Sequence, residues 1–141
     1  MTNDKLILII DDEEDIREVA QMCLELTAGW RTEGVGSGAE GLACARSDRP
    51  DAILLDVMMP GKDGIAVLAD LKADPLTAAI PVIMLTAKAR TERHPPAGAA
   101  GVIVKPFDPA KLADQVAELL SWSSVPAHAP DGQSAGEPTI G

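Results

Sequence analysis

Four short, unbroken runs of apolar residues constrain the fold of this chain more than any other feature. Each run has the length of a β-strand and does not alternate with polar residues, so both faces of each strand are expected to be buried. Such a sheet is typically parallel and covered by helices on both sides. The runs are Leu6–Ile10, Ala52–Leu55 with Val57, Pro81–Leu85 and Val102–Val104, and a weaker edge strand is predicted over Trp30–Val35.

The segments between these runs carry helical periodicity. Apolar residues recur at i, i+3, i+4, i+7 and i+8 from Ile16 to Leu24, and Asp12 is placed to cap this helix. A last helix is predicted over Asp108–Leu120, with Asp108 as its cap and Pro109 in the first turn. Two shorter helices are predicted over Gly38–Arg46 and Gly64–Lys72. The alternation predicts an α/β fold with right-handed crossovers and a doubly wound parallel sheet.

The 141 residues suffice for one hydrophobic core, which the predicted elements place in residues 1–121. From residue 122 the periodicity stops and prolines and glycines interrupt a run of small residues, so residues 122–141 are expected to be a disordered tail. The chain carries no signal-peptide pattern and no long apolar segment. A cytoplasmic protein without membrane insertion is therefore expected.

Composition argues against several classes of function. The formal net charge of −10 opposes contact with nucleic-acid phosphates, so no DNA binding is expected. With two Trp, one Phe and no Tyr, the chain lacks the aromatic residues of a base-stacking surface. Cys23 and Cys44 have no metal-ligand spacing and are predicted to pack in the core.

Polar residues follow the predicted strands at their carboxyl ends. Ligands of doubly wound sheets bind at this edge, where the strand order reverses, so these side chains are expected to converge. Three carboxylates in one crevice repel one another unless a cation neutralises them, and Mg²⁺ prefers such oxygen ligands. The residues are Asp11, Asp12, Asp56, Thr86 and Lys105.

One of these carboxylates could then attack phosphorus to form an aspartyl phosphate. Phosphoryl transfer needs mainly positioning and charge neutralisation, which a metal ion, the ammonium group of Lys105 and the hydroxyl group of Thr86 would supply. Taken singly, Asp12 could be only a helix cap, Thr86 a strand residue and Lys105 a solvated charge. Their joint placement at strand ends favours the chemical interpretation.

At this point the chain resembles a response-regulator receiver domain of two-component signal transduction. The resemblance covers about residues 5–121 and rests on four motifs in the family's order. These are LILIIDD over residues 6–12, LLDVMMPGKDG over 54–64, PVIMLTA over 81–87 and VKPF over 104–107.

The resemblance implies a flavodoxin-like sheet in the order 2-1-3-4-5 and a switch that catalyses only its own phosphorylation and dephosphorylation. It implies a sensor histidine kinase or phosphotransfer protein as phosphohistidine donor, an unidentified downstream protein target, and a stand-alone regulator without DNA-binding output. The implied site consists of Asp56 as phospho-acceptor, Asp11, Asp12, Asp56 and the Met58 backbone carbonyl as Mg²⁺ ligands, Thr86, Ala87 and Lys105 as phosphoryl contacts, and a cis Lys105–Pro106 peptide bond.

Two features depart from the family pattern. Residues 88–100 contain Pro95 and Pro96, which limit any helix there, so a shortened or missing fourth helix is expected. This segment is also cationic and is a candidate contact for an acidic partner. Val102 stands where the family commonly has an aromatic switch residue, so we expect the relay through that ring to be absent or reduced.

Two other functions remain open from the sequence. A Mg²⁺-dependent phosphatase or phosphotransferase would also use an aspartate nucleophile, although adjacent acids replace the Asp-x-Asp pattern such an enzyme would want. A flavodoxin-like scaffold would never be phosphorylated. Within the receiver interpretation, a diffusible messenger, a phosphorelay intermediate and a phosphate sink are all open.

Overall fold

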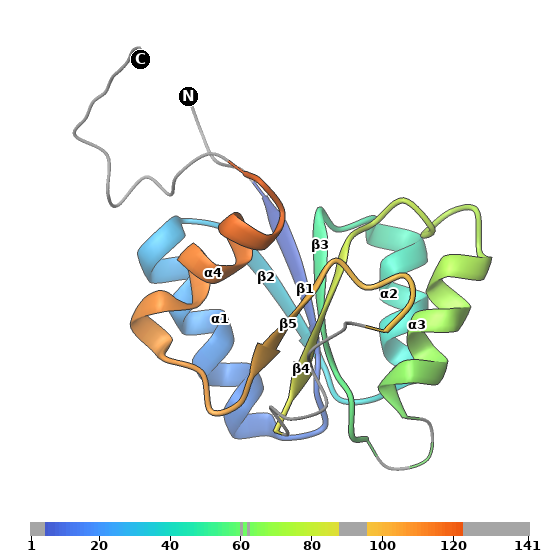
Figure 1. Cartoon of the computed structure of the whole chain (residues 1–141), viewed down its shortest axis with the longest axis horizontal. Coiled ribbons are helices and arrows are strands. Elements are labelled where there is room, and N and C mark those ends of the chain that lie inside the picture. Colours follow the sequence, from blue (N-terminus) through green and yellow to red (C-terminus); the bar gives the residue numbers. More distant parts are fainter. Residues whose placement is uncertain (1–4, 60, 62, 88–95, 123–141) are drawn as a thin grey trace.

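The computed structural model describes residues 5–59, 61, 63–87 and 96–122, and in these it contains one five-stranded parallel sheet (Figure 1). The strand order β2-β1-β3-β4-β5 confirms the predicted doubly wound, flavodoxin-like topology. The strands are β1 (Leu6–Ile10), β2 (Arg31–Val35), β3 (Ala52–Asp56), β4 (Val82–Thr86) and β5 (Gly101–Val104).

Helices cover both faces of the sheet. Figure 1 shows α1 and α4 on one side and α2 and α3 on the other. The helices are α1 (Glu14–Ala28), α2 (Gly38–Asp48), α3 (Gly64–Ala73) and α4 (Leu112–Leu119), with the short 3₁₀ helix η2 (Pro109–Lys111) preceding α4. Between β4 and β5, the described residues 87 and 96–100 form no helix, and residues 88–95 of the expected shortened helix lie outside the described residues.

The core has two halves because successive strand residues point to opposite faces. Ile7 and Ile9 pack with α1 and α4, whereas Leu8 and Ile10 pack with residues of α2 and α3. All four side chains are fully buried, and burial of each contributes roughly 1.5 to 3 kcal/mol. The central strands are apolar along their whole length because helices cover both faces of the sheet there.

The predicted cap of α1 is wrong. The residue before the helix is Glu13, whose side chain makes no capping hydrogen bond, and the backbone N–H of Glu13 donates to Oδ1 of Asp11 at 2.9 Å. Asp12 is exposed. The carboxylate of Asp11, directly after β1, accepts a hydrogen bond from the free backbone N–H of Glu13 at the start of the turn. The side chain of Asp12 is therefore available for other contacts.

The C-terminal elements follow the prediction closely. Oδ1 of Asp108 accepts a hydrogen bond from the backbone N–H of Ala110 at 3.0 Å, and Pro109 opens η2. The ring of Trp122 makes an edge contact with Trp30 at a centroid distance of 5.3 Å and packs on the core. The folded part therefore includes Trp122, and residues 123–141 of the predicted tail lie outside the described residues.

Candidate functional site

Parallel strand register brings the predicted site residues to one edge of the sheet. Ile10 of β1 pairs with Leu55 of β3, so Asp11 and Asp56, each one residue further along, lie at the same level. Thr86 is the last residue of β4 and pairs with Val104, after which Lys105 follows directly. Residues distant in sequence converge here because all five strands end on the same side.

The three aspartates form one cluster. Asp11, Asp12 and Asp56 each offer a carboxylate oxygen, and these oxygens all lie within 4.8 Å of one another. Asp11 and Asp56 are buried and Asp12 is exposed. The cluster therefore extends from the carboxyl edge of the sheet to the protein surface. Hard oxygen donors at this spacing match the preference of Mg²⁺, which uses few carboxylates and retains water in its shell.

Lys105 is the cation of the site. Its Nζ atom lies 3.0 Å from Oδ2 of Asp11, 3.3 Å from Oδ1 of Asp56 and 3.1 Å from Oε1 of Glu13. Burial alone would lower the pKa of Lys105, but hydrogen bonds to Asp11 and Glu13, with the charges of Asp11 and Asp56, raise it above its ordinary value. Lys105 is therefore charged and balances part of the acidic cluster.

The contact between Glu13 and Lys105 was not among the contacts predicted from the sequence. The position of Glu13 directly after the acid pair was the available signal. A long, exposed acidic side chain in that turn can reach back to the ammonium group across the site entrance. Because it is exposed, this contact is weaker than the pair that Lys105 makes with Asp11.

Among the carboxylates of the described residues, Asp56 has the largest pKa shift. The residue is only 4% exposed. Burial and the neighbouring charge of Asp11 raise the pKa of Asp56 from 3.8 to about 6, although Lys105 and the backbone N–H of Met58 oppose the shift. The charge of this buried carboxylate is only partly compensated, so a bound cation would strongly stabilise its ionised form.

The turns beside the strand ends are held by the backbone. The Lys105–Pro106 peptide bond is cis, and the backbone N–H of Lys105 donates to the carbonyl oxygen of Thr86 at 2.6 Å. Thr86 is buried, and Ala87 next to it is exposed. The side chain of Met58 is 68% exposed, and its N–H donates to Oδ1 of Asp56 at 3.4 Å.

Gly64 allows the chain to turn from the end of β3 into α3. Its N–H donates to the carbonyl oxygen of Val57 at 2.8 Å, and a Cβ atom added at this position would collide with the carbonyl oxygen of Asp56. Only glycine allows this approach between the start of α3 and the end of β3. Gly64, the last residue of the 54–64 motif, is therefore required because the backbone of Asp56 leaves no room for a side chain at this position.

Comparisons with known proteins identify one family. Residues 7–117 match the family model described as the response regulator receiver domain. Over 119 residues the chain is 40% identical to the phosphate regulon transcriptional regulatory protein PhoB of Pseudomonas aeruginosa, covering 82% of this chain and 52% of that protein. It is 36% identical over 140 residues to the DNA-binding response regulator MtrA of Mycobacterium tuberculosis, covering 86% of this chain and 60% of that protein.

Solved structures give the same result. The chemotaxis response regulator CheY4 of Vibrio cholerae superposes with a TM-score of 0.76 at 29% identity and covers 83% of this chain and 99% of that one. The receiver domain of sensor histidine kinase PA1611 from Pseudomonas aeruginosa, described with a magnesium ion coordinated in the active site cleft, has a TM-score of 0.74 at 27% identity, with 84% and 98% covered.

The chain spans about half the length of the curated relatives that it matches. The stand-alone arrangement expected from the sequence therefore stays a prediction. None of the helices in the described part of the chain has both the length and the hydropathy that a membrane crossing requires.

Proposed function

The chain belongs to the response regulator receiver domain family, and from that membership we propose that it accepts a phosphoryl group on Asp56 and thereby switches a protein interaction. The observation that carries this proposal is the position of Asp56. Its buried carboxylate stands at the carboxyl edge of the sheet, beside two further aspartates and 3.3 Å from the ammonium group of Lys105.

The proposed donor is a phosphohistidine of a sensor histidine kinase or phosphotransfer protein. An oxygen of Asp56 forms a bond to phosphorus while the phosphorus–nitrogen bond breaks. The electron pair of that bond leaves with the imidazole of the donor, which takes up a proton. The product is an aspartyl phosphate, and attack of water on its phosphorus later releases inorganic phosphate and restores the carboxylate.

The residues present fit a magnesium site, since the clustered donor atoms are all carboxylate oxygens. We propose that Asp11, Asp12, Asp56 and the backbone carbonyl of Met58 hold Mg²⁺, which would neutralise charge and accept phosphoryl oxygens. The related PA1611 receiver domain, described with magnesium in its cleft, supports this assignment.

The remaining residues of the site would act on the transferred group itself. Lys105, already charged and aimed at Asp56, would pair with a phosphoryl oxygen. Thr86 and Ala87, at the end of β4, would contact the same group, Thr86 through its hydroxyl. Phosphorylation would thus connect the ends of β4 and β5, the two strands that flank residues 88–100, to the phosphoryl group on Asp56.

The partner of the switch is proposed to be a protein in the cytoplasm. The net charge of −10 disfavours direct contact between these 141 residues and nucleic acid. The DNA binding named for MtrA belongs to a protein of which this chain covers 60%. We propose that this chain catalyses only its own phosphorylation and dephosphorylation and signals through protein contacts.

Incubation with acetyl phosphate and Mg²⁺ tests the proposal. We expect stoichiometric labelling that disappears with chelation of Mg²⁺ and in Asp56→Asn. Asp51→Asn is the matched control, because Asp51 directly precedes the same strand at its opposite end. Continued turnover of unrelated phosphate esters would instead indicate a phosphatase, and an unlabelled protein that does not bind Mg²⁺ would indicate a scaffold.

A further inference from the structure

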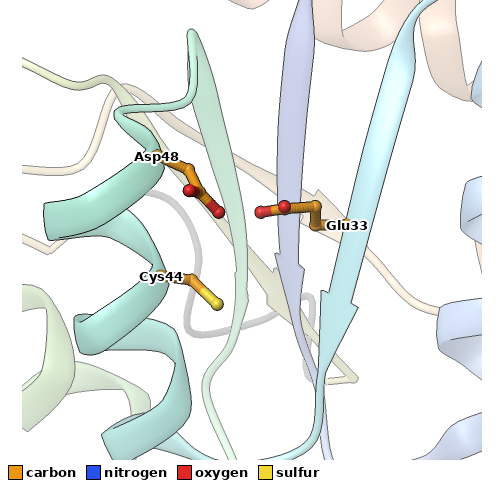
Figure 2. Close-up of side chains that lie close together, drawn as sticks. All are labelled: Glu33, Cys44 and Asp48. Carbon is orange, nitrogen blue, oxygen red and sulfur yellow. The ribbon is translucent and has the colours of Figure 1, made fainter.

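A second group of potential metal ligands lies away from the Asp56 site, between the edge strand β2 and helix α2. Figure 2 shows Glu33 pointing from β2 toward Asp48 of α2, with the thiol of Cys44 directed into the same space. Glu33 pairs with Leu8 in the sheet, and Leu8 faces the half of the core that contains Ala45 of α2. The side chain of Glu33 therefore faces α2 and not α1.

The spacing on the helix brings two of the ligands together. Cys44 and Asp48 are four residues apart on α2 and share one face of it. One ligand atom from each of Glu33, Cys44 and Asp48 lies within 4.8 Å of the others. Ligand atoms of a tetrahedral zinc ion lie about 3.5 Å apart, so small changes of side-chain rotamer bring these three to coordination distance.

An unpartnered buried atom provides an independent observation. Oε1 of Glu33 is shielded from solvent and accepts no hydrogen bond from any described residue. A buried carboxylate oxygen without a partner costs free energy unless a proton or a cation meets it. This oxygen belongs to the same cluster that contains Cys44 and Asp48.

The electrostatics of the cluster favour a cation. Burial, followed by the adjacent carboxylate of Asp48, raises the pKa of Glu33, and the charge of Arg31 is the smallest influence and opposes the shift. Burial, followed by the charges of Glu33, Asp48 and Glu40, raises the pKa of the Cys44 thiol. The acidic groups thus repel one another's charges, and a divalent ion would relieve that repulsion.

We propose that Glu33, Cys44 and Asp48 form a second metal site, which takes a borderline divalent cation of the Zn²⁺ class. One thiolate with two carboxylates suits Zn²⁺ better than Mg²⁺, which avoids sulfur. Three protein ligands leave a fourth position for water. Cys44, expected from the sequence to pack in the core, is in this proposal a ligand that loses its thiol proton on binding.

The site would tie the edge strand to its covering helix. β2 has one neighbouring strand in the sheet, and Thr32 of β2 bonds to Gln21 and Glu25 of α1, so a metal bridge to α2 would add an attachment on the opposite face. This inference does not depend on phosphorylation of Asp56. Bound metal should accordingly stabilise the fold in Asp56→Asn as well as in the unaltered chain.

Cobalt is the probe, because a thiolate ligand gives Co²⁺ a charge-transfer absorption that oxygen ligands do not. The full chain, reduced and in excess Mg²⁺ to occupy the aspartate cluster, is titrated with Co²⁺ and then with competing Zn²⁺. We expect one equivalent of Co²⁺ to produce the thiolate band and one equivalent of Zn²⁺ to remove it.

Variants assign the ligands. Cys44→Ala should abolish the band. Cys23→Ala, which alters the other cysteine of the chain and lies on α1, should retain the band. Asp48→Asn should weaken Zn²⁺ binding by tenfold or more, and Glu118→Gln, an exposed position on α4 across the sheet, should leave it unchanged. Since Asp48 is exposed, its variant carries the test if Cys44→Ala does not fold.

Several results would overturn the proposal. They are the absence of a thiolate band at one equivalent of Co²⁺, a band that survives in Cys44→Ala, and Zn²⁺ affinity that is the same in Asp48→Asn and in Glu118→Gln. A cluster that holds only a shared proton would give the first of these results. Labelling of Asp56 by acetyl phosphate is measured separately and bears on the other site alone.

Discussion

Replacing Asp56 with Asn should stabilise this protein against unfolding when no divalent cation is present. Asp56 is 4% exposed, and burial together with the charge of Asp11 raises its pKa from 3.8 to about 6. The folded state therefore holds the proton of Asp56 more tightly than the unfolded state does. Stability falls as the pH rises from about 4 to about 6, and the penalty is constant above that range.

The magnitude follows from the shift. About two pKa units at about 1.4 kcal/mol each give a penalty near 3 kcal/mol at neutral pH, an order-of-magnitude value. The amide that Asp56→Asn introduces carries no charge and has nearly the shape of the protonated acid, so the substitution removes the penalty. Urea unfolding in EDTA at about pH 7.5 should then show a midpoint higher by about 1 to 2 M.

The stability gain of Asp56→Asn should depend on pH. Near pH 4 the gain should fall to well under half of its neutral value, because Asp56 is then protonated in the folded state and partly protonated in the unfolded state. Asp51→Asn, at the opposite end of β3, should change the midpoint little at either pH. Added Mg²⁺ should stabilise the unaltered chain more than the variant and so narrow the difference.

If Asp56→Asn is no more stable than the unaltered chain in EDTA at neutral pH, the charge on Asp56 does not destabilise the fold. If the gain is the same near pH 4 as at neutral pH, the charge on Asp56 is not its source.

Three further predictions concern neighbouring residues. Gly64→Ala should destabilise the fold by more than about 1 kcal/mol in urea unfolding and slow phosphoryl labelling, because its Cβ collides with the carbonyl oxygen of Asp56; equal stability would refute the clash. Lys105→Met should slow labelling by acetyl phosphate about a hundredfold while calorimetry still detects Mg²⁺ binding, and an unchanged labelling rate would exclude Lys105 from the transfer. Amide chemical-shift mapping with a phosphoryl mimic should show the largest changes around Thr86 and Ala87, and large shifts propagating across β5 beyond Val102 would contradict the expected loss of the relay.

The order of the strands and helices was predictable because it depends on local patterns. Unbroken apolar runs and periods of 3.6 residues are legible in short windows of sequence, and each predicted strand lies within a residue or two of the observed one. The cap of the last helix was equally local, since Asp108 and Ala110 are two residues apart. The cap of α1 was predicted wrongly, because Asp11 and Asp12 offer the same chemistry one residue apart and only the backbone path decides between them.

The aspartate cluster was predictable for a different reason. Parallel strands end at the same edge, so chain topology alone brings residues that follow different strands together. The contact of Lys105 with Asp11 joins residues 94 apart in sequence, yet its direction follows from that rule. The role of Glu13 did not follow, because it depends on how far an exposed side chain reaches across the entrance.

The sequence by itself determined the strands, the helices and the edge at which Asp56 lies, because hydrophobic periodicity and the position of acids after strands are properties of the chain alone, whereas the strand order followed only from the family resemblance. Only the tertiary structure decided how strongly Asp56 resists ionisation and that Glu33 faces Cys44 and Asp48. Burial and the approach of β2 to α2 set these properties, and both depend on how distant segments pack. A pattern of residues therefore predicts where a charged side chain lies along the chain, whereas tertiary packing decides which other charged side chains it contacts.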